Sequence, residues 1–172
     1  VNTVSADKKT FELKYRHNET AGFPQYYVGD IVDFSTKGTM IPVQDSERTV
    51  VAVDGPKEGS LDTIRITLDR PVEGITGGNN SFVVENVTYT PEVEIRNNRF
   101  IETTTRGVLV STRKPIVIED NYFDAMGMSS IFISCEAQGW YESGHTENVI
   151  IRNNVFDRRS GSTIYVFPTG SN

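Results

Sequence analysis

Residues 93–100, Val-Glu-Ile-Arg-Asn-Asn-Arg-Phe, decide the fold because the chain repeats their pattern twice more. The pattern recurs at 116–123 as Ile-Val-Ile-Glu-Asp-Asn-Tyr-Phe and at 149–156 as Val-Ile-Ile-Arg-Asn-Asn-Val-Phe. A second short apolar run follows each copy, always starting 15 residues after the copy begins, at Val108, Ile131 and Ile164. A spacing that holds three times indicates a structural repeat.

Short alternating strands separated by an Asn bend are typical of parallel strands stacked coil upon coil. The last third to half of the chain is therefore expected to form about three coils of a right-handed parallel β-helix. The first two copies start 23 residues apart, which is a usual length for one coil. Stacking in this register predicts two interior columns, Phe100, Phe123 and Phe156 in one and Ile95, Ile118 and Ile151 in the other.

The polar positions of the repeat predict two further columns. Asn98, Asn121 and Asn154 are expected at a tight bend, where Asn tolerates left-handed backbone and its amide can bond to its equivalent one coil away. Arg96, Glu119 and Arg152 would stack as a surface ion ladder worth at most about 1 kcal/mol per pair. The alternative for this charged column is a substrate-binding cluster.

An insertion separates the second copy from the third. These copies start 33 residues apart, so about ten extra residues follow the second strand of the coil, near 137–146. This stretch contains Trp140, the only tryptophan, with Tyr141 and Glu142, and Glu136 precedes it directly. Loops on rigid scaffolds commonly carry recognition residues, and aromatic rings beside a carboxylate suit a sugar ring. The structural alternative is that Trp140 caps the exposed edge of a coil.

The first half contains no copy of the repeat. Alternating apolar segments at 11–15, 31–34, 49–53, 63–68 and 82–87 are separated by turn-forming clusters, which predicts a small antiparallel barrel or sandwich. The whole chain is thus expected to be all-β, with domains at 1–90 and 91–172. His17, in the loop after the first of these strands, is either a hydrogen-bonded structural residue or a ligand-binding one.

Composition excludes several classes of function. The 172-residue chain has a formal net charge of −6, the wrong sign for binding nucleic acid through phosphates. One cysteine and two histidines exclude a cysteine-rich zinc site and a multi-histidine metal site, so no metal or cofactor is expected. No apolar run is long enough to cross a membrane.

Four stretches carry a family resemblance: 17–23 with Gly29-Asp30, residues 93–100, residues 105–112, and Trp-Tyr-Glu-Ser-Gly at 140–144. Together they resemble the inverting α-1,3-galactosidases of glycoside hydrolase family 110. That resemblance implies a right-handed β-helix with an inserted small β-barrel, terminal α-linked galactose as substrate, and a periplasmic or extracellular location. Family members are several times longer, and their paired catalytic aspartates lie in coils before the inserted barrel. The resemblance therefore implies a piece of a longer enzyme.

Inverting hydrolysis needs a carboxylic acid that protonates the leaving oxygen and a carboxylate that activates water. Within this chain the candidates for those two roles are Glu136 and Glu142. The candidate substrate-binding residues are Arg106, which would lie one coil below as a hydrogen-bond donor, with Trp140, Tyr141 and His17.

Other functions remain open at this point. A noncatalytic carbohydrate-binding module would need the aromatic residues but no acid and base. A structural β-helix of a surface protein would use the outward column of Leu109, Phe132 and Tyr165 as an oligomer interface. A polysaccharide lyase is disfavoured by the acidic composition. Because three coils have two open ends, the remainder of a longer chain or a second copy is expected to cover the end at 93–100.

Overall fold

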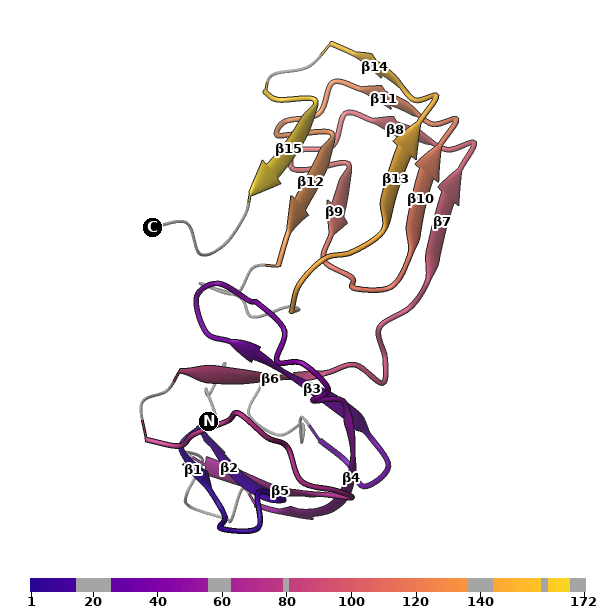
Figure 1. Cartoon of the computed structure of the whole chain (residues 1–172). Coiled ribbons are helices and arrows are strands. Elements are labelled where there is room, and N and C mark those ends of the chain that lie inside the picture. Colours follow the sequence, from indigo (N-terminus) through magenta and orange to yellow (C-terminus); the bar gives the residue numbers. More distant parts are fainter. Residues whose placement is uncertain (15–25, 56–62, 79–80, 136–143, 159–160, 168–172) are drawn as a thin grey trace. The chain divides into compact units, whose positions relative to one another are not determined.

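The computed structural model describes residues 1–14, 26–55, 63–78, 81–135, 144–158 and 161–167. Every regular element in these ranges is a β-strand, so the all-β prediction is confirmed, and no described segment forms a helix that could cross a membrane (Figure 1). The chain divides into two compact units, one of residues 1–37 and 41–89, the other of residues 90–172 with 38–40. That these units are independent domains stays a prediction.

The first unit contains one six-stranded antiparallel sheet with the strand order β1-β2-β5-β4-β3-β6. Its strands are β1 (Thr3–Val4), β2 (Thr10–Lys14), β3 (Ile31–Thr36), β4 (Arg48–Asp54), β5 (Thr63–Leu68) and β6 (Phe82–Asn86). Five of them match the predicted segments, whereas the two-residue β1 is too short for its alternation to be visible in the sequence.

The sheet curls around an apolar core, as the barrel-like prediction requires (Figure 1). Phe11, Phe34 and Ile66 point inward from three different strands and have no exposed surface. The curl brings the two edges together, because the Val1 amine, next to β1, donates to the Phe82 carbonyl at the start of β6 over 2.7 Å. The first unit is therefore a curled half-barrel whose edge strands approach each other.

The second unit consists of three parallel sheets, each built from one strand per coil (Figure 1). The first sheet contains β7 (Val93–Arg96), β10 (Ile116–Glu119) and β13 (Val149–Arg152). The second sheet contains β8 (Arg99–Ile101), β11 (Tyr122–Asp124) and β14 (Val155–Asp157). The third sheet contains β9 (Val108–Val110), β12 (Ile131–Ser134) and β15 (Ile164–Phe167). We call β7–β9, β10–β12 and β13–β15 coils one, two and three.

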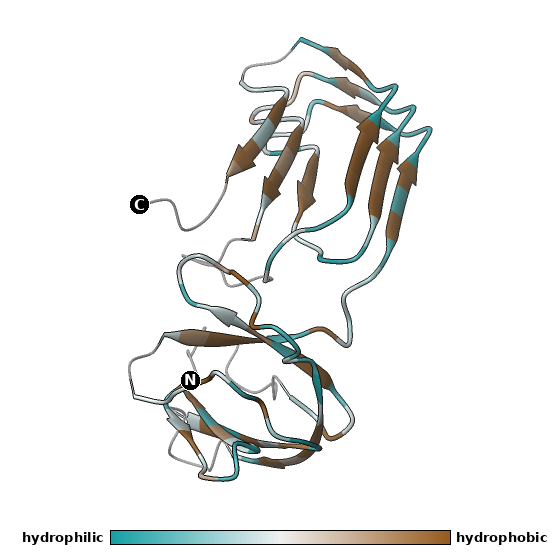
Figure 2. Cartoon of the chain, in the orientation of Figure 1, coloured by the Kyte–Doolittle hydropathy of each residue, from teal (hydrophilic) through white to brown (hydrophobic). Residues whose placement is uncertain are grey.

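The predicted register of these coils is confirmed. Ile118 pairs with Ile95 and Ile151, and Phe123 pairs with Phe100 and Phe156. The three phenylalanine rings stack with centroids 4.6 and 5.2 Å apart, at the spacing of neighbouring strands. Figure 2 shows the outcome along the chain, with hydrophobic strands and hydrophilic bends.

An asparagine ladder joins the first and second sheets at their shared bend. The Asn121 side chain accepts from the backbone N–H of Asn98 over 2.9 Å and donates to the Ile95 carbonyl over 2.8 Å. The same pattern repeats one coil on, where the Asn154 side chain accepts from Asn121 and donates to Ile118. Asn121 and Asn154 thus satisfy backbone groups of the preceding coil that the bend leaves unpaired.

The left-handed residue of this bend is not the ladder asparagine, which corrects the sequence-based expectation. Positive φ angles of 56–57° occur one residue earlier, at Asn97, Asp120 and Asn153. The two neighbouring residues of each bend therefore have different roles. The first supplies the αL turn, which Asn and Asp tolerate better than other side chains, and the second supplies the hydrogen bonds.

The charged column is more buried than predicted. Glu119 forms ion pairs with both Arg96 and Arg152, as the register requires. However, only 6% of the Glu119 side chain is exposed, compared with 37% for Arg96 and 58% for Arg152, so the ladder has a buried carboxylate between two exposed arginines. A carboxylate this buried is compensated by cations on both sides, and removing either one would leave the charge less well paired.

A second ion pair closes the bend after the second sheet. Both carboxylate oxygens of Asp124 accept from the Arg158 guanidinium, and the Nε–Oδ1 distance is 2.7 Å. These hydrogen bonds, together with the positive charges of Arg158 and Arg99, hold the pKa of the Asp124 carboxyl below its ordinary value, although burial acts the other way.

Coil two is the only coil with neighbours on both sides within the described chain, and its side chains are accordingly more buried than those of coils one and three. Its strand residues are mostly buried, whereas coils one and three carry many half-buried or exposed ones. Every residue of β15 is exposed. Large apolar side chains exposed on coil three are Ile150, Val155, Ile164, Tyr165, Val166 and Phe167.

Replacing Asn121 with Ala should destabilise the chain by about 2–3 kcal/mol, because it leaves buried backbone groups of coil one without partners. Asn98→Ala is the matched control. Asn98 is exposed and its side chain donates to the Arg96 carbonyl of its own coil, so the loss should stay below about 1 kcal/mol. Chemical denaturation measures both values, and equal losses would contradict the role of the ladder.

The Asp124–Arg158 pair should contribute to stability at neutral pH but not in acid. Because the folded-state pKa of Asp124 is lowered, the contribution is complete above the unfolded-state pKa and disappears as the pH falls below about 4. Asp124→Asn should therefore lower the free energy of unfolding more at pH 7 than at pH 3, measured by denaturation at both values. In an Arg158→Gln background this pH dependence should be much smaller, because only the charge of Arg99 still lowers the pKa of Asp124, and an undiminished dependence would contradict the assignment.

Candidate functional site

The predicted site lies around the third sheet, at the end of β12. The structure describes the chain up to Cys135, after β12, and again from Gly144, before β13. Glu136, Trp140, Tyr141 and Glu142 lie outside the described residues, as does His17 in the first unit. Their assigned roles stay predictions. Arg106 is the one predicted site residue within the described ranges.

Arg106 lies against an aromatic ring of the next coil. Its guanidinium carbon is 4.7 Å from the centroid of the Phe132 ring, which projects outward from β12. The Phe132 ring in turn stacks on Tyr165 of β15, with centroids 5.3 Å apart and 11° between the ring planes. We call these three residues the outer stack. Phe132 is outside the apolar core cluster of the β-helix, which agrees with the predicted outward column.

The Arg106 guanidinium has no hydrogen-bonding or acidic partner within the described ranges of the chain. Arg96, Arg152 and Arg158, by contrast, are all paired with carboxylates. The half-buried Arg106 guanidinium is therefore stacked on a ring, and the described residues occupy none of its N–H donors. This is the donor role that the sequence assigned to Arg106.

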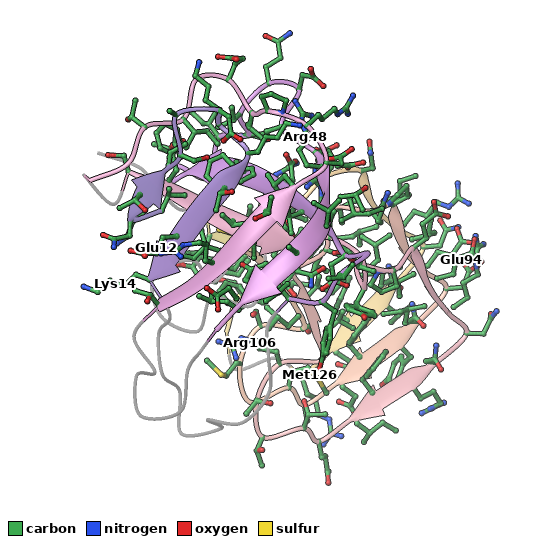
Figure 3. The ribbon with its side chains drawn as sticks, turned by 90° about the horizontal axis from the view of Figure 1, so that it is seen from below. Glu12, Lys14, Arg48, Glu94, Arg106 and Met126 are labelled. Atoms are coloured by element: carbon green, nitrogen blue, oxygen red, sulfur yellow. The ribbon has the colours of Figure 1, made fainter. Side chains whose placement is uncertain are left out.

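Backbone hydrogen bonds join the turn that carries Arg106 to the turn that precedes β12 in the next coil. Gly127 N–H donates to the Thr103 carbonyl over 2.8 Å, and Met128 N–H donates to the Thr105 carbonyl over 3.0 Å. Thr103 Oγ1 also contacts the sulfur of Met126, and Figure 3 labels Arg106 and Met126, which come from these two stacked turns. The donor group therefore starts from a fixed backbone position.

The packing around position 107 explains why glycine follows Arg106 in the motif that carries the family resemblance. A Cβ atom at this position would lie 2.6 Å from the Ser130 carbonyl oxygen and 2.8 Å from the Phe123 ring. Because the first neighbour is backbone and the second is a core ring, neither can move away easily. Glycine lets this corner pack tightly on coil two, directly beside the Arg106 backbone.

Arg106 precedes a strand of coil one and the insertion follows a strand of coil two, so the two begin at opposite ends of paired strands. Arg106 precedes the first residue of β9, whereas the insertion follows the last residue of β12, and the two strands are parallel. A four-residue strand separates these ends by about 13 Å. The Arg106 side chain shortens this distance by lying over the ring of Phe132, the second residue of β12. A ligand touching both would lie along the outer face of the third sheet.

Two carboxylates at strand ends of the β-helix, Glu119 and Asp124, are held by arginines and do not form an acid and base pair. Glu119 is paired with two arginines, and Asp124 binds Arg158 through both oxygens. A general acid must carry a proton near neutral pH, which the lowered pKa of Asp124 disfavours. These groups are structural, and the described residues contain no group of three or more His, Cys, Asp or Glu arranged to hold a metal ion.

Sequence reasoning gave no role to His145, which lies where the insertion rejoins the β-helix. Its Nε2 pairs with the carboxylate of Glu147. Its Nδ1 and the hydroxyl of Thr146 are buried polar atoms without a hydrogen-bond partner in the described part of the chain. A His-x-Glu sequence beside an inserted loop was the available signal for this pair.

Comparisons with known proteins agree with this architecture. A family model described as a right handed beta helix region matches residues 72–172. A protein named alpha-1,3-galactosidase A from Peterkaempfera griseoplana is 43% identical over 98% of this chain. A Streptomyces avermitilis protein with that name is 50% identical over 93% of it, and one from Bacteroides fragilis strain YCH46 is 40% identical over 87%.

These alignments cover 25%, 26% and 24% of the respective relatives. The chain thus spans about a quarter of the length of the curated relatives that it matches. The resemblance to α-1,3-galactosidases and the expected β-helix are both confirmed. The chain belongs to the right-handed β-helix family and is a relative of proteins named alpha-1,3-galactosidase.

Proposed function

We propose that the natural gene product containing this sequence is a glycoside hydrolase that removes terminal α-1,3-linked galactose. The observation that carries this proposal is the sequence identity of 40–50% to proteins named alpha-1,3-galactosidase A over 87–98% of the chain. The Arg106 guanidinium beside the third sheet, which has no hydrogen-bonding partner within the described ranges, supports it, because sugar hydroxyls are acceptors for such a donor.

Within this proposal the chain supplies substrate recognition. Arg106 donates hydrogen bonds to sugar hydroxyls from the outer face of the third sheet, and the insertion adds Trp140 and Tyr141 as stacking residues. Glu136 and Glu142 are the acid and base candidates inside the chain. The family resemblance instead implies a pair of aspartates outside it, in which case the two glutamates bind substrate. Either pair would need a separation of about 6.5–9.5 Å for inversion.

The second candidate function is a noncatalytic carbohydrate-binding module. One observation favours it: Glu119 and Asp124, two buried carboxylates of the β-helix, are both engaged by arginines and are therefore unsuited to act as an acid and base. Sugar binding without turnover by the natural gene product would support this function over hydrolysis.

The open coils are proposed to be covered in the natural protein. Coil three exposes several large apolar side chains, and coil one carries half-buried core residues such as Ile95 and Phe100. We propose that further chain or a second copy stacks on these ends, because stacked repeats need capping. A periplasmic or extracellular location is proposed for the same protein from its family resemblance.

The natural gene product should release galactose from α-1,3-galactobiose, and NMR of the first product should show the β-anomer, as inversion requires. Glu136→Gln and Glu142→Gln test the two candidates inside the chain. A loss of kcat of about 100-fold or more identifies an acid or base. A rise in KM alone identifies a binding residue, and no change in either variant would contradict their assignment.

Arg106→Ala should raise KM for the galactoside about tenfold or more, since a hydrogen bond from a charged group is lost. Arg99→Ala is the matched control. Arg99 also lies over an aromatic ring, with its guanidinium carbon 4.8 Å from the Tyr122 centroid, but it belongs to the second sheet. Kinetics that are equal for the two variants would contradict a binding role for Arg106.

A further inference from the structure

Arg106 is oriented by a ring contact, since the described residues give it no hydrogen bond. Its guanidinium approaches Phe132 from coil one, and Tyr165 approaches the same ring from coil three. Because β12 is the middle strand of the third sheet, these two neighbours cover Phe132 from opposite sides. Both faces of the Phe132 ring are thus occupied, and the ring cannot itself be a stacking surface for a sugar.

Phe132 is also the most buried member of the outer stack. It has 7% of its surface exposed, compared with 45% for Tyr165 in the same register of the next coil. A buried ring held between a cation and a second ring has little freedom to rotate. A cation that rests on such a ring gains both attraction and a fixed plane.

We propose that Phe132 is a positioning residue for galactoside recognition, because its ring sets the plane in which Arg106 presents N–H donors to the sugar. The inference rests on the function proposed above and adds a residue to that site. A planar guanidinium has parallel N–H groups that can reach two neighbouring acceptors, such as adjacent sugar hydroxyls. Free rotation of the side chain would lose this paired geometry, whereas stacking on Phe132 preserves it.

The chain contains a matched comparison for this contact. Arg99 over Tyr122 reproduces the cation–ring distance, 4.8 Å against 4.7 Å, between the same pair of coils. That pair lies on the second sheet. The Tyr122 hydroxyl donates to Asp157, whereas Phe132 stacks on the ring of Tyr165. Tyr122→Leu therefore removes a similar ring contact at a place with no proposed role in binding.

The experiment measures KM and kcat for α-1,3-galactobiose in the natural gene product. Phe132→Leu should raise KM about threefold to tenfold, the range expected for a lost cation–π contact, with kcat changed less than about twofold. Phe132→Tyr keeps an aromatic ring under the guanidinium and should therefore raise KM less than Phe132→Leu does. Tyr122→Leu should leave both constants unchanged.

A double-mutant cycle separates positioning from general stability. In an Arg106→Ala background, Phe132→Leu should raise KM no further, because the ring acts only through the guanidinium. An additional rise there, an unchanged KM in Phe132→Leu alone, or an equal rise in Tyr122→Leu would overturn the inference. If Phe132→Leu does not fold, Arg106→Lys replaces it. That variant keeps the charge but loses the planar group, so an unchanged KM would again overturn the inference.

The proposed function and this inference fail differently. A wild-type protein that neither cleaves nor binds the galactoside overturns the proposed function and the inference with it. A wild-type protein that is active, with kinetics indifferent to Phe132, overturns the inference alone.

Discussion

In the second unit, equivalent positions of neighbouring coils lie one strand spacing apart. Each such position must therefore carry side chains that can pack against, or hydrogen-bond to, their equivalents in the next coil. Phenylalanine therefore stacks on phenylalanine, and asparagine donates to the coil before it. The ladder asparagines are as important as the apolar columns, because a three-sided coil must bend and each bend interrupts the backbone pairing of the strands. Phe132 stacks on Tyr165 for the same reason, since the register places the two rings at the same position of adjacent coils.

The repeat predicted the strands of this unit and their pairing, because the spacing of equivalent residues along the sequence determines which residues pair. A one-residue error would have turned Phe123 outward, so the apolar and polar positions determine the pairing together. Two local features were not predicted correctly. The left-handed residue is Asp120 and not Asn121, since both positions accept Asn or Asp and the pattern does not distinguish them. Glu119 is buried because arginines cover it from two coils, and its exposure depends on side-chain packing.

The site was less predictable than the fold. Arg106 was identified through its resemblance motif, and Gly107 beside it has a plain steric reason in the Phe123 ring. Its contact with Phe132 crosses between a turn and a strand of different coils, which the repeat pattern does not describe. The pairing of His145 with Glu147 was missed because neither residue belongs to a repeated position. In the first unit, alternation located five strands, but it could not locate β1 or the approach of the two edges.

The unequal spacing of the copies has an evolutionary consequence. Ten additional residues between β12 and β13 leave every register pair between coils two and three in place. Loop length at this corner is therefore decoupled from the fit of the core. Mutation can lengthen, shorten or replace the loop while selection on folding acts elsewhere. A scaffold with this property can acquire new ligand preferences in steps that each leave a foldable protein.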